Sequence, residues 1–359
     1  MKKIIQYTLA FGFLLVGVSC SDSLENRLLT KASGRPGEII LVMDSIQWKG
    51  ELGEALKNTL RANTPGIPIP EPLFTVRFIE PTLFNSVLKS AKNIIVVATL
   101  DSQTKGGLIV RNYVTKEYIS SNPDKFMVSQ KDVFAKGQDL LYLFADSESN
   151  LAEKINKYQE AVRTYFNNAE SERLQVSLYK ALEKTGITAK LKTDHGFNIR
   201  VPNGYRIEAN DSSFIWLRSP GEIDKNIFIG YKPYTSDEVF QNDQLIALRN
   251  SITHEGIFED PANPDSYMTT DTINMKPIYK TTELNGNYAK NVKGIWRTSN
   301  LALGGSFESY VLVDEHLNRL YYIEGFVASP GKNKRETMRE LNVILGTFKT
   351  SEEKVLVEN

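Results

Sequence analysis

The run Glu38-Ile-Ile-Leu-Val-Met43, which ends at Asp44, indicates how the first half of the chain folds. A short, continuous apolar run of this kind is typical of a strand buried on both faces between layers of helices. Further apolar runs lie at 74–79, 93–99 and 140–145, and helix-like segments lie at 52–60 and 83–91. Because strands that alternate with helices imply a mixed or mainly parallel sheet, we predict an α/β module over residues 38–186.

Two connections of this module carry local signals. Four prolines between residues 65 and 72 impose an extended, non-helical segment after the first helix. The longest helical pattern starts at Asn150, which forms an N-cap signature with Glu153, and ends at Gly186, a C-cap residue. Its apolar phase breaks at 167–170, which predicts either one kinked helix or two helices.

The second half of the chain has short, alternating strands rather than continuous apolar runs. Consecutive strands with helices held to one side indicate an antiparallel α+β module, which we place at residues 187–350. Helices are expected at 236–251 and 333–348. The expected strands are 197–201, 205–208, 213–218, 226–234, 277–283, 288–298, 307–314 and 320–328.

The amino end predicts export. Lys2 and Lys3 precede an apolar stretch over 4–18, which is shorter than the roughly 20 residues of a membrane-spanning helix. We therefore expect residues 1–19 to be a cleaved signal peptide. Cys20, the single cysteine of the chain, stands where a bacterial lipoprotein carries its lipid, and the alternative is simple secretion with an incidental thiol. Residues 20–37 are then a lipidated tether and 351–359 a tail.

The composition excludes several classes of protein. The 359 residues are 41% hydrophobic and 24% charged, with 43 basic and 43 acidic residues, which is typical of a soluble globular chain. The absence of net charge argues against nucleic-acid binding. His195, His254 and His316 lie outside any catalytic motif, and the sequence has no zinc, EF-hand or phosphate-loop pattern. We therefore expect no catalytic residue, no metal and no cofactor.

Two strand faces carry polar groups that could form a site. Trp216 and Arg218 share one face of their strand, and Glu324 lies between two aromatic residues on another. A carboxylate on an apolar face needs a cationic partner, and Arg218 is our hypothesis for it. The pair is expected either at a rim or as a ligand-orienting pair in a pocket.

A second candidate combines an aromatic ring with bare backbone. Trp296 precedes Gly304 and Gly305, a setting that can accept a sugar ring or peptide but is more often a core tryptophan over a bulge.

A third candidate is a cluster of cations at the start of the last helix. Lys332, Lys334 and Arg335 crowd a helix N-terminus, where cations are disfavoured by about 0.3 to 1 kcal/mol each. Either this is a solvated basic turn, or an anion such as a phosphate, a lipid head group or an acidic partner offsets the cost.

These segments resemble a family of uncharacterised envelope lipoproteins of Bacteroidota, known only as a domain of unknown function. The stretches that carry the resemblance include Ser33-Gly-Arg-Pro-Gly-Glu38, Ile69-Pro-Glu-Pro72, Phe214-Ile-Trp-Leu-Arg218 and Gly325-Phe-Val-Ala-Ser-Pro330. The resemblance implies no reaction. In the carboxy-terminal half, Phe197-Asn-Ile-Arg-Val-Pro202 and Ile344-Leu-Gly-Thr-Phe348 are weakly similar to PsbP-like and Mog1-like domains, which usually serve as binding modules.

These observations favour a non-catalytic binding or scaffolding lipoprotein, anchored to an envelope membrane by its lipid, with another envelope protein or a glycan as partner. The alternative is an envelope hydrolase that acts on glycan or peptide through carboxylates such as Asp44, Glu71 or Glu324, because paired acids need no sequence motif.

Overall fold

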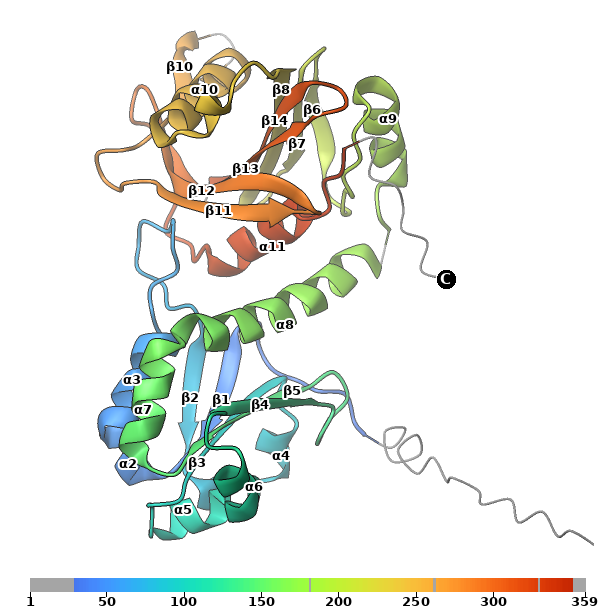
Figure 1. Ribbon diagram of the computed structural model, residues 1–359. Helices are drawn as coiled ribbons and strands as arrows, with labels where there is room; N and C mark the ends of the chain where they lie inside the picture. Colours follow the sequence, from blue (N-terminus) through green and yellow to red (C-terminus); the bar gives the residue numbers. More distant parts are fainter. Residues whose placement is uncertain (1–28, 181, 261–262, 329, 351–359) are drawn as a thin grey trace, which may run out of the picture.

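The computed structural model describes residues 29–350 apart from 181, 261–262 and 329, so Cys20, the signal peptide and the tail lie outside the described residues. Two domains, each with its own sheet, lie one above the other in Figure 1, and the long helix α8 (Gln159–Lys180) runs between them. The α/β and antiparallel α+β classes expected from the sequence are confirmed.

The first domain has a five-stranded sheet in the order β2-β1-β3-β5-β4. β1 pairs in parallel with β2 and β3, β3 pairs in parallel with β5, and β4 is antiparallel to β5. Every residue of β3 and β5 is buried, as continuous apolar runs require. The strands are β1 (Glu38–Val42), β2 (Thr75–Ile79), β3 (Asn93–Thr99), β4 (Met127–Lys131) and β5 (Asp139–Ala145).

Helices cover both faces of this sheet. One core contains side chains from α3, α7 and α8, and the core on the opposite face contains side chains from α5 and α6. The remaining short helices connect strands at the sheet ends. The helices are α2 (Ser45–Lys49), α3 (Glu51–Leu60), η1 (Pro81–Leu83), α4 (Ser86–Lys89), α5 (Lys105–Val110), α6 (Lys116–Ser121), α7 (Glu148–Lys157) and α8.

The second domain has a nine-stranded sheet in the order β6-β7-β8-β14-β13-β12-β10-β9, and β11 pairs with β12 beside this path. All of its strand pairs are antiparallel. The strands are β6 (Arg206–Asn210), β7 (Phe214–Ser219), β8 (Asp224–Pro233), β9 (Phe258–Asp260), β10 (Asn263–Thr270), β11 (Ile278–Leu284), β12 (Asn287–Thr298), β13 (Gly304–Asp314) and β14 (Arg319–Ala328).

Helices pack on both faces of this second sheet as well. The core on one face includes residues of α11 (Arg335–Leu345) and α9 (Thr185–His195), and the core on the other includes residues of α10 (Asn242–Gly256). A single turn, η2 (Asp237–Phe240), leads into α10. The sheet is therefore covered on both sides, and α11 packs mainly on β14, β13 and β8.

Several local expectations are wrong. Gly186 does not end a helix but lies inside α9, whose left-handed C-cap is Gly196. The Asn150–Glu153 signature does not start a helix, because Ser147 caps α7 by accepting a hydrogen bond from the Asn150 backbone N–H. The segment 197–201 forms only an isolated bridge from Asn198 to Lys349 instead of a strand, and 83–91 contains one short helix, α4, rather than one long one.

Candidate functional site

The start of α11 lies against the first domain, where a carboxylate caps it. Lys334, the N-cap residue, makes no side-chain cap. The cap comes instead from Glu71, whose two carboxylate oxygens accept hydrogen bonds from the backbone N–H groups of Lys334 (2.6 Å) and Arg335 (3.0 Å). The Arg335 guanidinium also donates to the carbonyl of Pro72 (2.8 Å). An anion at this helix N-terminus complements its unsatisfied N–H groups and its dipole.

This contact explains how three cations are tolerated at one helix start. The anion that faces Lys334 and Arg335 is Glu71 of the same chain, 263 residues away in sequence from Lys334. Lys332 pairs with Glu222, and Lys334 donates from its ammonium group to the Lys332 carbonyl (2.8 Å). The binding of an external anion by these three residues stays a prediction.

Two glycines bring the domains into close contact. Gly37 and Gly66 have φ values of +65° and +81°, a region that side chains other than glycine's rarely adopt. A Cβ at Gly66 would lie 3.0 Å from the Cβ of Lys293 on β12, and a Cβ at Gly37 would lie 2.8 Å from the Glu336 carboxylate. The proline-rich segment predicted as an extended connection thus reaches the second domain, as its course in Figure 1 shows.

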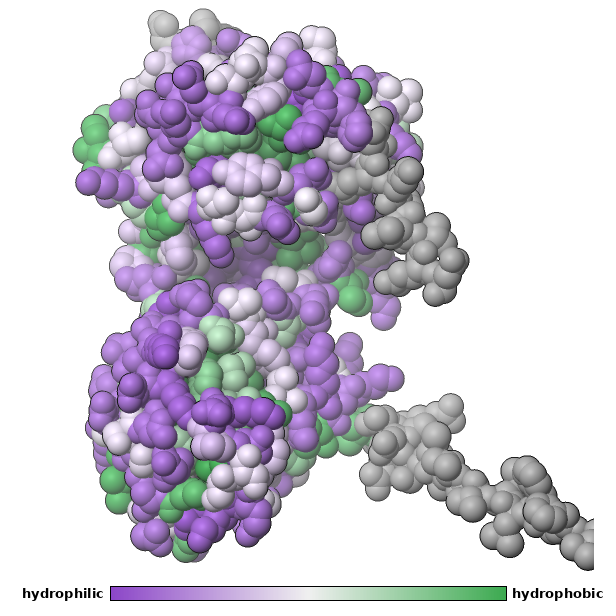
Figure 2. All heavy atoms as spheres, viewed as in Figure 1, coloured by the Kyte–Doolittle hydropathy of each residue, from purple (hydrophilic) through white to green (hydrophobic). Residues whose placement is uncertain are grey.

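Beside these contacts lies a cleft between the domains, with a cavity volume of about 420 Å³, within the range of ligand sites. One wall comes from α8 and residues 62–65 of the first domain, and the other from α11, β11, β12 and β13. Figure 2 shows a hollow between the two domains with mainly hydrophilic residues around it. The charged side chains that line the cleft are Arg163, Lys280, Lys293, Arg335, Arg339, Glu160 and Glu308.

The floor of the cleft is a polar network on β12 and β13. Glu308 is buried, and its Oε1 accepts a hydrogen bond from the Asn291 amide (3.1 Å) and forms a salt bridge with the Lys293 ammonium (3.1 Å). The Tyr310 hydroxyl donates to Asn342 of α11 (2.7 Å). Burial, and then the nearby Glu308 carboxylate, raise the pKa of Tyr310, so this hydroxyl stays a proton donor.

The cleft carries more positive than negative charge. Five cations and two carboxylates line it, a difference of three. Arg163 pairs with Glu160 and Lys293 pairs with Glu308, whereas Lys280 is exposed and forms no ion pair with any residue that the structure describes. Arg335 and Arg339 both pair with Glu336. Lys280 therefore offers an approaching ligand a positive charge that is not already paired, which favours an anionic group beside it.

The expected pairing of Glu324 with Arg218 is wrong. Glu324 is fully buried, and its partner is Arg249 of α10, which donates to both carboxylate oxygens at 2.8 and 2.7 Å. Tyr322 donates to the same carboxylate at 2.6 Å, and the Arg249 guanidinium lies over the Phe307 ring. Burial raises the pKa of Glu324, and the adjacent guanidinium opposes that increase.

Arg218 pairs instead with Asp224 on the neighbouring strand. Its guanidinium donates to both oxygens of that carboxylate, with a shortest distance of 2.7 Å. The structure nevertheless brings Trp216, Arg218 and Trp296 to one small cavity of about 120 Å³. The Trp216 indole already donates to Asn226 (3.0 Å). This cavity lies below the usual size of a ligand pocket, and a ligand role for these residues stays a prediction.

Trp296 packs in the core against a part of β13 where glycine leaves room for its ring. It is 4% exposed and its indole donates to the carbonyl of Val327 (3.1 Å). Gly305 pairs with it in register, and a Cβ there would lie 1.9 Å from the Val327 oxygen and 2.9 Å from the indole nitrogen. Gly305 is therefore needed for this packing. Gly304 precedes it at the exposed start of β13.

Asp44 is the third acid considered for catalysis, and it lies at the carboxyl end of β1. In the sheet, β2 lies on one side of β1 and β3 on the other, so the chain changes direction across the sheet at this point. Ligands of open α/β sheets often bind at such a point. Asp44 is buried and accepts hydrogen bonds from Ser102 (2.7 Å), Thr104 (2.6 Å) and the backbone of Ile46. Burial, and then three nearby acids, raise the pKa of neighbouring Glu148. Among the described residues, no group of His, Cys, Asp and Glu is arranged to hold a metal ion.

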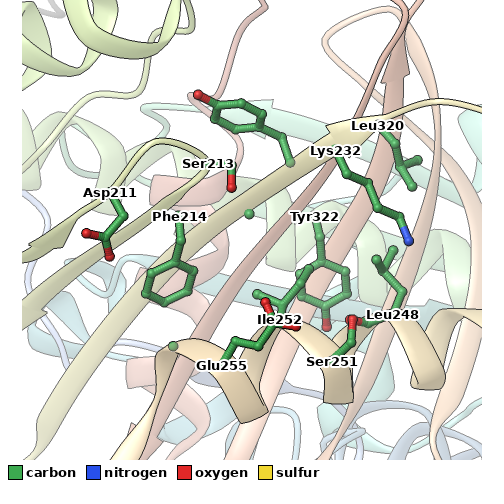
Figure 3. Close-up of a pocket in the computed structure, with 13 residues that line it drawn as sticks. Asp211, Ser213, Phe214, Lys232, Leu248, Ser251, Ile252, Glu255, Leu320 and Tyr322 are labelled. Carbon is green, nitrogen blue, oxygen red and sulfur yellow. The ribbon is translucent and has the colours of Figure 1, made fainter.

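A second cavity of about 400 Å³ lies within the second domain, between α10 and strands β7, β8 and β14. Figure 3 shows Phe214, Ile252 and Tyr322 between the strands and the helix, with Asp211 and Lys232 at opposite ends. A side chain at Gly230 would meet Ile252 at 3.0 Å, so this glycine lets α10 approach the sheet. The sequence did not single out this cavity, because its residues come from four separate elements.

Comparisons with known proteins place a different domain in each half. Residues 32–179 match the model of a domain of unknown function, DUF8532, and residues 184–347 match the model of another, DUF4837. Each half of the chain thus matches a domain of unknown function, which agrees with the resemblance seen in the sequence to an uncharacterised family of this kind. No curated protein matches it.

Solved structures show weak similarity to Mog1, as the sequence also indicated. The Saccharomyces cerevisiae Ran-binding protein Mog1p is 10% identical over 47% of this chain and 94% of that chain, with a TM-score of 0.30. A Mog1 variant is 9% identical over 44% and 92%, with a TM-score of 0.27. A protein from Bacteroides thetaiotaomicron is 10% identical over 44% and 46%, with a TM-score of 0.26. TM-scores this low carry no argument about function.

Proposed function

We propose that the protein is a lipoprotein of the bacterial cell envelope, exported from the cytoplasm and anchored through Cys20, whose two domains form a non-catalytic binding module. The membrane part rests on the sequence: a basic start, an apolar stretch, and the single cysteine behind it. Two or more acyl chains anchor a protein stably, whereas one chain binds only marginally. Within the described residues no helix is long and apolar enough to span a bilayer.

The binding part rests on the interdomain cleft. Clefts between domains are common ligand sites, and this one combines basic side chains with amide groups from both domains. The acids considered for hydrolysis support a non-catalytic role. Asp44, Glu71 and Glu324 lie in three separate environments, and each accepts at least two hydrogen bonds from its own chain.

Acylation is tested by growing cells that express the protein with radiolabelled palmitate. We expect label in the wild-type chain and none in Cys20→Ala, with mass spectrometry showing an amino terminus at Cys20. An unlabelled wild-type chain with the apolar stretch still attached would contradict the anchor.

Binding is tested by affinity purification of the tagged protein from its own envelope under mild detergent. We expect a component that copurifies with the wild type and with Lys192→Glu, an exposed control on α9, but is lost with Lys280→Glu/Lys293→Glu. A component retained equally by both variants would contradict a role for the cleft, and its absence from all samples would contradict stable binding.

A further inference from the structure

The cleft is bordered by a strand with one unpaired edge. β11 pairs with β12 from Ile278 opposite Lys293 to Leu284 opposite Asn287, and with no other described strand. The two strands are joined by Asn285 and Gly286, whose φ values of +50° and +83° are those of a type I′ turn. The register of β11 is therefore fixed by its turn.

That turn determines which backbone groups face outward. In a two-residue hairpin the residues that flank the turn form a hydrogen-bonded pair, and bonded and non-bonded pairs then alternate. Leu284 and every second residue before it bond to β12. Tyr279, Thr281 and Glu283 consequently direct their backbone N–H and C=O groups away from β12, towards the free edge. Such an edge is a template for an additional strand.

The side chains beside this edge define which strand would fit. Ile278 and Lys280 line the cleft, and Ile278 is 44% exposed. Residues of an added strand that lie opposite Lys280 would share its face of the sheet, where opposite charges attract. Lys293 of β12 and Arg339 of α11 also line the cleft, where they pair with Glu308 and Glu336. The wall formed by the first domain adds the amides of Asn63, Asn167 and Asn168.

From this arrangement, and building on the proposed function, we propose that the cleft binds an extended acidic peptide segment of a partner protein, which adds as a strand to the free edge of β11. Main-chain hydrogen bonds to Thr281 and its outward-facing neighbours give affinity, and the basic side chains select acidic residues at alternate positions. A peptide fits this site better than a glycan because the edge offers donors and acceptors with the spacing of a polypeptide backbone.

The test uses the complete mature chain and a fluorescein-labelled hexapeptide of alternating Glu and Thr, followed by fluorescence anisotropy. The comparison probes are the same peptide N-methylated at alternate residues, a hexapeptide of alternating Lys and Thr, and a galacturonic acid hexasaccharide. We expect the acidic peptide to bind, N-methylation to weaken it about tenfold, and the other two probes to bind more weakly still.

Matched variants separate backbone pairing from charge. Thr281→Pro removes one outward N–H, which an edge strand tolerates, and Thr281→Val keeps it. Both variants lose the same contact from the Lys290 ammonium to the threonine hydroxyl. We expect Thr281→Pro and Lys280→Glu each to weaken the acidic peptide about tenfold and Thr281→Val to leave it unchanged, with all melting temperatures preserved.

Two results would overturn this inference. Equal affinity of Thr281→Pro and Thr281→Val would show that the backbone of β11 does not pair with the peptide. Tighter binding of the hexasaccharide than of the peptide, abolished by Lys280→Glu, would reject the peptide but leave the proposed function of the cleft intact. An envelope purification in which no component copurifies with the wild type, or in which Lys280→Glu/Lys293→Glu retains the same component, would instead reject the proposed function itself.

Discussion

Two buried carboxylates, Glu324 and Glu71, are stabilised by different kinds of partner. Glu324 lies inside the second domain and pairs with a guanidinium, whereas Glu71 lies between the domains and accepts hydrogen bonds from backbone N–H groups. Glu324 is fully buried and Glu71 is 8% exposed. Buried charge therefore serves two purposes here: the Glu324 pair is part of a domain core, and the Glu71 contact holds the two domains together.

The largest effect is expected from Arg249→Met. This variant leaves the Glu324 carboxylate buried without its cation, which costs about 3 to 5 kcal/mol of unfolding free energy. Chemical denaturation followed by tryptophan fluorescence measures the loss. In the control, Arg249→Met/Glu324→Leu, the charge is removed together with its partner, so we expect much of the stability to return. A double variant as unstable as the single one would contradict the assignment of this pair.

The same variant should gain stability on acidification. Burial raises the pKa of Glu324 above its ordinary value of 4.5, and without Arg249 only the hydrogen bond from Tyr322 opposes that increase. Between the unfolded and folded pKa values the native state then binds more protons than the unfolded state, so stability falls as pH rises. We therefore expect the deficit of Arg249→Met to shrink as the pH is lowered towards 4.5 and to be largest at neutral pH.

An intermediate effect is expected from Glu71→Ala. Loss of the cap at α11 should cost about 0.5 to 2 kcal/mol, and limited proteolysis should cut the proline-rich segment faster because the domains separate more readily. The control is Glu172→Ala, because that exposed acid pairs with an exposed lysine and should change neither quantity. Unchanged proteolysis in Glu71→Ala would show that the cap does not hold the domains together.

The smallest effect is expected from Arg218→Ala. Its pair with Asp224 is partly exposed, with side-chain exposures of 33% and 22%. The variant should therefore lose less than about 1 kcal/mol of unfolding free energy. Because Arg218 and Glu324 share no partner, the losses of Arg218→Ala and Glu324→Ala should add within about 0.5 kcal/mol in the double variant. A larger coupling energy would restore the pairing that the sequence suggested.

The sequence predicted one half of the buried pair and missed the other. Glu324 stands between aromatic residues on an alternating strand, which marks a charge on an apolar face. Arg249 carries a comparable signal, since it occupies the apolar stripe of Leu245, Leu248 and Ile252 at helical spacing. The basic start of α11 was likewise recognised, whereas the identity of its anion was not.

The cleft itself could not be predicted. Its residues come from segments more than two hundred positions apart, and no local pattern records that residues 62–65 lie against β12. The free edge of β11 was equally hidden, because the sequence shows a hairpin with an Asn-Gly turn but not which of its edges another strand covers.

The two fold classes and most of the strands could be predicted from the amino-acid sequence alone, because each depends on residues close together along the chain. The partners of the buried charges and the position of the cleft became known from the three-dimensional structure. Arg249 and Glu324 are 75 residues apart, so their contact exists only after α10 has packed on the second sheet. Glu71 and Lys334 are 263 residues apart, and their contact exists only after the two domains have met. Local periodicity carries no information about such distant pairings.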